Sequence, residues 1–159
     1  MESIGEQKVQ ILLAALGERY TSLHNIRTRV ESTGTWIIGL SLGAGGWLLQ
    51  SSASITGLQK AVLIVGVIGA FIVFRFFYLA DLRRGFCAQQ RVAAKIETAL
   101  GLFLPGHFGV EDSIYPAKWK NAGTTKSDGK FFNSTYLLVY VATTFLIFSI
   151  LVSGSLVTL

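Results

Sequence analysis

The residue types that most often form catalytic and metal sites are scarce in this sequence. The 159 residues include two histidines, His24 and His107, and one cysteine, Cys87. His107 is followed by Glu111 and Asp112, but this order within a glycine-rich stretch does not match the spacing of a recognised metal or acid–base site. We therefore expect no enzyme, no catalytic residue, no metal site and no bound cofactor.

Basic residues offer a different chemistry, the binding of anions. Four of them follow the second apolar stretch closely: Arg83, Arg84, Arg91 and Lys95. Basic side chains just outside a bilayer attract anionic lipid headgroups, at about 1 kcal/mol each. An anionic ligand or an acidic protein partner is the alternative, although no glycine-rich phosphate loop accompanies these residues. We expect no nucleic acid as a direct ligand.

Arg75 is a charge placed inside an apolar stretch, about one helical turn from its end. A long side chain at such a position can extend its charge to the membrane interface. The alternatives are that Arg75 lines an inner vestibule or pairs within an oligomer.

Glycines form a second pattern of interest. Gly39 and Gly43 are four residues apart and Gly46 lies one turn further, so all three share one face of a helix. Small residues let helices approach closely in lipid. We expect a helix-packing or oligomer face at this position, with a glycine-lined water pathway as the alternative.

Hydroxyl groups form the third pattern, near the end of the chain. The residues concerned are Tyr136, Tyr140, Thr143 and Thr144. They are candidates for a pore lining. The alternative is ordinary helix packing, because a hydroxyl group inside an apolar helix can bond to its own backbone.

The helices that carry these residues can be predicted from the stretches of sequence that lack charged side chains. Hydrophobic residues make up 51% of the chain and charged residues 14%, against about 25% charged in a typical soluble domain. Residues 32–59 and 131–159 carry no charged side chain, and residues 61–80 carry only Arg75. A helix needs about 20 apolar residues to cross a bilayer. The sequence therefore predicts three transmembrane helices, Trp36–Ile55, Ala61–Leu79 and Thr135–Val157, of which the first is the least apolar.

The basic residues predict the orientation of these helices. Of the 14 Lys and Arg residues, 12 fall in residues 1–31 and 81–130, whereas only Lys60 lies in the connection between the first two predicted spans. Cytoplasmic loops of membrane proteins are rich in Lys and Arg. We therefore expect a bacterial inner (plasma) membrane protein with a cytoplasmic N-terminus and with its C-terminus outside.

The predicted fold class is an all-α membrane protein with three transmembrane helices and two cytoplasmic amphipathic helices. A seven-residue apolar repeat of Val9, Leu16, Leu23 and Val30 favours packing of the first cytoplasmic helix against another helix over a position flat on the membrane. The expected segments are a cytoplasmic N-terminal helix (1–31), a transmembrane hairpin (32–80), a cytoplasmic helix and loop (81–130) and a third transmembrane span (131–159).

This layout resembles that of the SLATT-type small membrane effectors of bacteria, over roughly residues 10–102. The residues that carry it are Glu18-Arg19-Tyr20, Arg27 and Arg29 before the first span and Asp81-Leu82-Arg83-Arg84 after the second. The resemblance implies an effector that a partner gates, often a nucleotide-signalling enzyme of anti-phage defence, and that then permeabilises the inner membrane. The third span departs from the two-span form of these proteins, and no site residue can be transferred from them.

The functional expectation combines these patterns. Three thin spans cannot enclose a pore alone, so we expect a homo-oligomer in contact with membrane lipid. The leading expectation is an oligomeric inner-membrane pore or membrane-disrupting effector, gated through its cytoplasmic helices. The alternative is a non-conducting membrane scaffold or regulatory subunit that docks a cytoplasmic partner.

Overall fold

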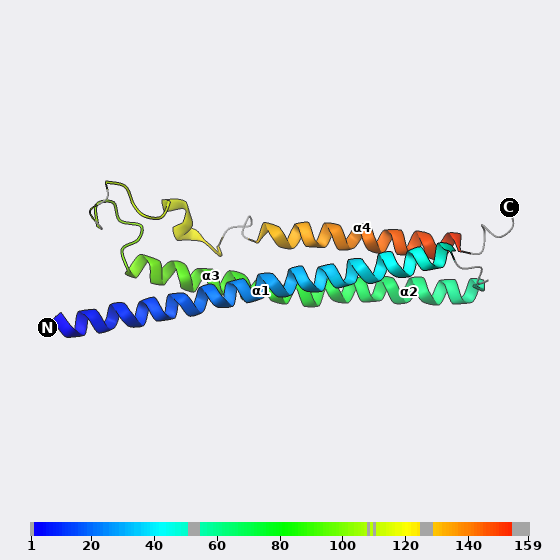
Figure 1. The fold of residues 1–159 in the computed structure, drawn as a ribbon, viewed down its shortest axis with the longest axis horizontal. Helices are drawn as coiled ribbons and strands as arrows, with labels where there is room; N and C mark the ends of the chain where they lie inside the picture. The colour runs from blue at the N-terminus through cyan, green and yellow to red at the C-terminus, as the bar shows by residue number, and fades with distance from the viewer. Residues whose placement is uncertain (1, 51–54, 108, 110, 125–128, 154–159) are drawn as a thin grey trace. The chain divides into compact units, whose positions relative to one another are not determined.

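The computed structural model describes residues 2–50, 55–107, 109, 111–124 and 129–153, with the backbone alone for residues 2–4. Its elements, shown in Figure 1, are α1 (Glu2–Gln50), α2 (Gly57–Val73), the π-helical segment η1 (Phe74–Leu79), α3 (Ala80–Ala99), the 3₁₀ helix η2 (Ala117–Asn121) and α4 (Lys130–Val152). No strand occurs in these described ranges. The all-helical fold predicted from the sequence is confirmed.

The chain divides into two compact units. Unit 1 comprises residues 1–28 and 82–130, and unit 2 comprises residues 29–81 and 131–159. The long helix α1 contributes its first half to unit 1 and its second half to unit 2. The segment boundaries that the charge pattern predicts lie after residues 31, 80 and 130.

Helix α1 joins two segments that the sequence analysis treats separately, the cytoplasmic helix of residues 1–31 and the start of the span Trp36–Ile55. No proline occurs before Pro105, so nothing removes a backbone donor or forces a break in α1. Residues 51–54, which belong to that predicted span, lie outside the described part of the chain.

Helices α2 and α3 are likewise continuous through η1, from Gly57 to Ala99. A capping box starts this helix: the Gln59 amide N–H donates to Thr56 Oγ1, and the Thr56 amide N–H donates to Gln59 Oε1 at 3.0 Å. The helix ends just before Gly101, as the sequence predicts, and Gly101 has a φ of +77°. Glycine adopts this left-handed conformation without steric penalty and commonly ends helices.

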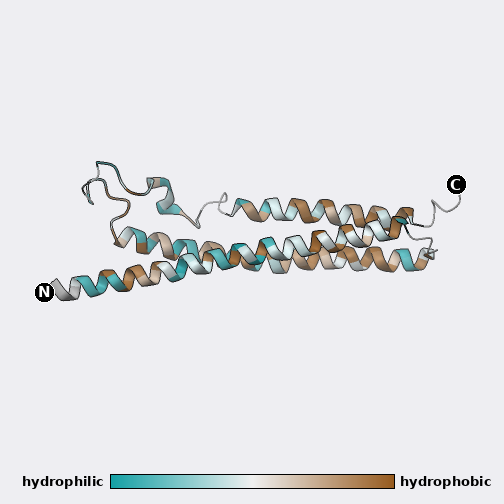
Figure 2. Cartoon of the chain, viewed as in Figure 1, coloured by the Kyte–Doolittle hydropathy of each residue, from teal (hydrophilic) through white to brown (hydrophobic). Residues whose placement is uncertain are grey.

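Within the part of the chain that the structure describes, two helices are long and apolar enough, by length and composition, to cross a membrane. They are the continuous helix Gly57–Ala99 and α4, and both carry long hydrophobic stretches in Figure 2. The sequence analysis expects three such helices, and α1 is not one of them. Its second half contains several small or polar residues that lower its hydropathy: Gly39, Ser41, Gly43, Gly45, Gly46 and Gln50. Residues 154–157 of the predicted span Thr135–Val157 lie outside the described residues.

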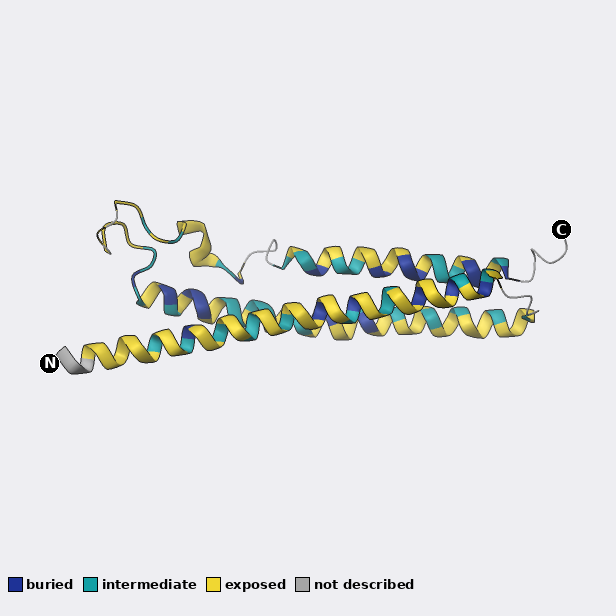
Figure 3. Ribbon diagram, in the orientation of Figure 1, coloured by how far each residue is buried: buried dark blue, intermediate teal, exposed yellow. Residues whose placement is uncertain are grey.

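Much of the apolar surface of these two helices is uncovered in the protomer. The exposed fraction is 71% for Val65, 69% for Phe77 and 60% for Leu137. A core helix of a soluble protein buries such side chains, since each buried one contributes about 1.5–3 kcal/mol. Figure 3 shows that buried residues form only a narrow stripe on α4 and on the second half of α1, and α2 contains no buried residue.

The core of unit 2 lies where the second half of α1 meets α4. Val30, Val139 and Ile150 are each no more than 2% exposed. A Cβ atom at Gly34 would lie 2.6 Å from Thr135 Cγ2, and one at Gly45 would lie 2.7 Å from Phe145 Cε1. Glycine is therefore required at both positions for α1 and α4 to approach this closely.

Candidate functional site

The three glycines singled out by the sequence lie on an open face of α1. Among the described residues, a Cβ atom added at Gly39, Gly43 or Gly46 would lie within 4 Å of no atom beyond its immediate neighbours on α1. The glycines that pack against α4 are instead Gly34 and Gly45. Packing of the predicted motif within the hairpin, one of the two expected arrangements, is therefore not what the protomer shows.

The open face extends beyond these glycines. Helical spacing places Ser32, Trp36, Gly39, Gly43, Gly46 and Gln50 along one side of α1, which we term the glycine face. Trp36 is 70% exposed, and Trp47, which flanks the face, is 63% exposed. On this side of α1, glycines without side chains thus lie near two large, exposed tryptophan rings.

The four candidate pore-lining residues of α4 make contacts inside the protomer. The Phe71 ring centroid lies 5.6 Å from that of Tyr136 and 6.0 Å from that of Tyr140. Thr143 is buried, and the Thr144 hydroxyl donates to the Tyr140 carbonyl oxygen at 2.9 Å. These contacts fit the helix packing given as the alternative, but Tyr140 is 50% exposed and Thr144 is also exposed, so the pore lining stays a prediction.

Arg75 in η1 has an aromatic partner that the sequence analysis missed. Its guanidinium carbon lies 4.6 Å from the ring centroid of Tyr136 and 5.9 Å from that of Phe76. A cation over an aromatic face is attracted by the ring quadrupole, most strongly where water is excluded. Many aromatic residues surround Arg75 in the sequence, and they could have indicated that an aromatic ring is its partner.

The interior of unit 2 encloses little space. A cavity of about 160 Å³ lies between α1, α2, η1 and α4. Ser41 and Thr143 are the polar side chains among its lining residues, and the others are aliphatic or aromatic. A cavity of this size and lining is a packing gap and provides no polar path through a single protomer.

Unit 1 is held together by polar contacts between the first half of α1 and α3. The Arg19 guanidinium donates to Gln89 Oε1 at 2.8 Å, and the Tyr20 hydroxyl donates to Glu97 Oε1 at 2.6 Å. Glu97 is only 7% exposed, and Leu16 of the predicted apolar repeat is equally buried. Arg19 and Tyr20, which make these polar contacts, lie between Leu16 and Leu23 of the repeat.

The Tyr20 hydroxyl has two contacts in unit 1, with Glu97 and with Tyr115. Burial of its hydroxyl raises the pKa of Tyr20 above its ordinary value, and the hydrogen bonds with Glu97 and Tyr115 raise this pKa further. A tyrosine with a raised pKa stays protonated, so Tyr20 remains a hydrogen-bond donor to the Glu97 carboxylate at physiological pH.

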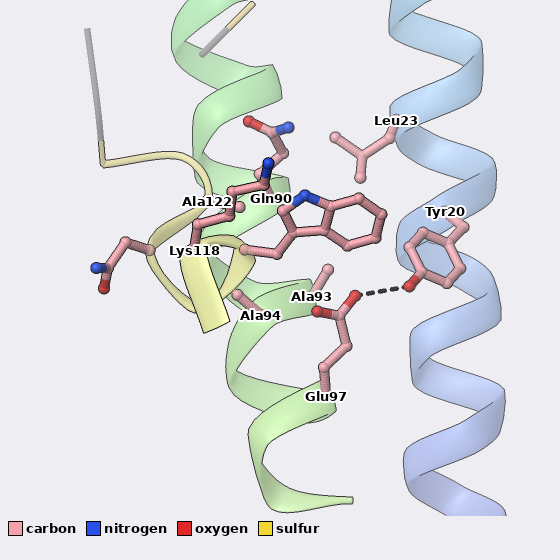
Figure 4. A pocket seen from close by; sticks show the side chains of 10 residues that line it. Tyr20, Leu23, Gln90, Ala93, Ala94, Glu97, Lys118 and Ala122 are labelled. Atoms are coloured by element: carbon pink, nitrogen blue, oxygen red, sulfur yellow. Dashed lines mark hydrogen bonds between the residues drawn. The ribbon is translucent and has the colours of Figure 1, made fainter. Parts of the chain in front are cut away.

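Beside this seam lies the larger cavity of unit 1, which has a volume of about 500 Å³ (Figure 4). Helix α1 contributes Tyr20 and Leu23, α3 contributes Glu97 and its neighbours, and η2 contributes Trp119. Gln90 also lines it, and its Oε1 atom is buried without a hydrogen-bond partner among the described residues. Sequence analysis did not identify this cavity, because η2 is distant from α1 and α3 in the chain.

The predicted basic face is divided by the structure. Arg91 and Lys95 line a second cavity of about 380 Å³, together with Lys120 of η2. Arg83 and Arg84 are not among the residues that line it. Lys120 was not singled out in the sequence, because only the folded loop brings it to α3.

The residues with catalytic side chains remain dispersed. His24, Glu111 and Asp112 are exposed, and His107 lies beside Gly101. Across the described ranges, no group of three or more His, Cys, Asp or Glu residues is arranged to hold a metal ion.

Comparisons with protein-family models, with curated proteins and with solved structures found no match to this chain. The resemblance to SLATT-type effectors therefore stays a prediction based on layout. Functional inference depends on the residues and geometry described above.

Proposed function

We propose that this chain is a homo-oligomeric membrane protein in which copies assemble through the glycine face of α1 and together form a pore or another permeable assembly. The observation that carries this proposal is the open space at Gly39, Gly43 and Gly46, where an added Cβ atom would lie within 4 Å of no neighbouring segment among the described residues. Glycines so placed permit close approach of a second helix in lipid.

The proposal requires α1 to cross the membrane together with the two more apolar helices. Contacts within unit 2 support this, because Gly45 of α1 packs on Phe145 of α4. The hydroxyls of Thr33 in α1 and Tyr78 in η1 also lie 2.9 Å apart. A helix of moderate hydropathy can cross when α4 covers one of its sides and a neighbouring copy covers another.

The distribution of basic residues supports the orientation. Unit 1 contains most Lys and Arg residues of the chain, which favours the cytoplasmic side of a bacterial inner membrane for this unit. The N-terminus would then lie in the cytoplasm and the C-terminus outside. Unit 1 would be the part that receives a gating signal, since it holds the larger cavities.

A conducting path, in this proposal, forms between copies. The cavity of about 160 Å³ between the helices of unit 2 is lined mostly by apolar side chains, whereas the glycine face carries Ser32 and Gln50 beside its glycines. A polar side of a membrane-crossing helix is stable where it faces other helices or water. Membrane permeabilisation is also the activity that the resemblance to SLATT-type effectors of bacterial defence implies.

The test is a comparison of Gly39→Leu with Gly66→Leu. Both glycines have open space around the missing Cβ, but Gly66 lies on α2. Light scattering in detergent should show that Gly39→Leu dissociates the oligomer while Gly66→Leu leaves it intact. In cells, a voltage-sensitive dye should report depolarisation by the wild type and by Gly66→Leu, and its loss in Gly39→Leu.

Two outcomes would contradict the proposal. An unchanged oligomer in Gly39→Leu would exclude the glycine face as the interface. Oligomers that leave the membrane potential intact with every co-expressed neighbouring gene would exclude the pore and favour the alternative, a non-conducting scaffold that docks a cytoplasmic partner.

A further inference from the structure

The second cavity of unit 1 gathers three cations from two elements, and we term it the basic cavity. Arg91 and Lys95 are four residues apart on α3, so they share a face of that helix, and Lys120 belongs to η2. The other residues that line it are Ala, Thr and Asn. Within the described part of the chain, none of the three cations forms an ion pair with a carboxylate.

The position of Lys120 is built by packing of the loop on α3. Gly123 is buried with a φ of +80°, and a Cβ atom there would collide with the Cys87 carbonyl oxygen and lie 3.0 Å from Arg91 Cγ. On the other side of Lys120, the ring centroid of Trp119 lies 5.5 Å from that of Tyr115. The loop therefore has close contacts on both sides of the lysine.

Apart from the Asn121 side-chain amide, the donors left available in the basic cavity are charged. The Thr98 hydroxyl already donates to the Ala94 carbonyl oxygen at 2.7 Å, and the Thr124 hydroxyl donates to the Asn121 carbonyl oxygen at 2.6 Å. Arg91 donates through Nε to the Cys87 carbonyl oxygen at 3.4 Å, which leaves its two terminal amino groups. Among the described residues, these groups and the ammonium groups of Lys95 and Lys120, all on exposed side chains, have no protein acceptor, so they are available to a ligand from solvent.

A ligand that satisfies these groups must bring negative charge and several acceptor oxygens. Like charges four residues apart destabilise a helix, so an anion placed between Arg91, Lys95 and Lys120 relieves repulsion as well as supplying acceptors. Phosphate groups match both requirements, and arginine and lysine are the residues that most often bind them.

We propose that the basic cavity binds a phosphate group, carried either by a phospholipid headgroup or by a soluble phosphate compound. The site includes Lys120 and excludes Arg83 and Arg84, which separates it from a general attraction of basic residues to a membrane surface. It does not depend on whether the protein conducts.

The experiment uses the full-length protein in a neutral detergent and follows its thermal unfolding by circular dichroism. Inorganic pyrophosphate and dioctanoyl phosphatidylglycerol are titrated separately, with sodium chloride as the control for ionic strength. The matched variants are Lys120→Gln and Lys118→Gln, which remove the same charge from the same short helix, although Lys118 lines the other cavity. We expect the apparent affinity to fall about tenfold in Lys120→Gln, because a hydrogen bond to a charged group is lost, and less than about twofold in Lys118→Gln.

The two probes distinguish the two sources of phosphate. Stabilisation by pyrophosphate supports a soluble ligand, whereas stabilisation by phosphatidylglycerol alone supports a lipid headgroup. The proposal is overturned if neither probe raises the unfolding midpoint beyond the chloride control. It is equally overturned if Lys118→Gln and Lys120→Gln weaken the response to the same extent.

Discussion

The Lys60 ammonium group donates to the Ser153 carbonyl oxygen at 2.5 Å and to the Leu151 carbonyl oxygen at 3.0 Å. Helix α4 ends at Val152, so the Leu151 carbonyl belongs to its last turn and the Ser153 carbonyl follows directly, where carbonyl oxygens lack N–H donors within the helix. A cation at this end also interacts favourably with the helix dipole. Lys60 thus connects the start of α2 to the end of α4.

Replacing Lys60 should therefore weaken unit 2. Lys60→Met removes both hydrogen bonds and the charge at the end of α4, and we expect it to lower the free energy of unfolding by about 1 kcal/mol. Thermal unfolding in detergent, followed by circular dichroism, measures this change. Lys60→Arg retains donors and charge and should recover most of the stability; equal midpoints for wild type and Lys60→Met would show that the contact is unimportant.

The contact between Arg75 and Tyr136 should contribute a measurable coupling energy. We expect a double-mutant cycle of Arg75→Met and Tyr136→Leu to give about 0.5–2 kcal/mol, since the guanidinium carbon lies 4.6 Å from the ring centroid. Tyr136→Phe retains the ring and should preserve the coupling. Additive effects of the two single changes, within about 0.3 kcal/mol, would contradict a direct interaction.

The sequence predicts much of the fold because its main signals are local. Missing charge marks the apolar helices, and Gly101 marks the end of α3 correctly. The number of apolar helices was overestimated, because the absence of charge alone does not make a segment apolar. Gly39 and its neighbours are uncharged but contribute little hydropathy, so only two helices satisfy both conditions.

The sites were harder to predict because they depend on contacts between distant segments. Sequence spacing shows that Gly39 and Gly43 share a face, but it cannot show that Gly34 and Gly45 are the glycines that meet α4. Lys120 likewise reaches Arg91 and Lys95 only through the fold of the loop after α3. Both contacts depend on where neighbouring helices and loops lie in space. A local sequence pattern does not contain this information.

The hydrogen bond from Tyr20 to Glu97 should stabilise unit 1. Tyr20→Phe leaves the buried Glu97 carboxylate without this donor, and we expect a loss of about 1.5–3 kcal/mol, as is typical for a hydrogen bond to a charged group. Thermal unfolding at neutral pH measures it. Tyr115→Phe is the control, because the Tyr115 hydroxyl is 3.4 Å from that of Tyr20 and should contribute less.

The same contact predicts a pH dependence with a definite sign. The pKa of Tyr20 is raised in the folded state, so above its ordinary pKa of about 10 the unfolded chain releases the proton while the folded chain retains it. The stability advantage of the wild type over Tyr20→Phe should therefore be complete below about pH 10 and decrease as the pH rises further. An advantage that stays constant or grows above this pH would contradict the assignment.

The close approach of Gly123 to α3 should make it more sensitive to substitution than Gly106, which also has a positive φ. Gly106 has a φ of +73° with open space around it, whereas Gly123, at +80°, faces the Cys87 carbonyl oxygen. Gly106→Ala should cost about 1–2 kcal/mol from backbone conformation alone, and Gly123→Ala should cost more, because its Cβ also displaces the loop from α3. Limited trypsin digestion at Lys118 and Lys120 measures the displacement, and we expect faster cleavage in Gly123→Ala than in Gly106→Ala. Equal cleavage rates would mean that the loop is not held by this contact.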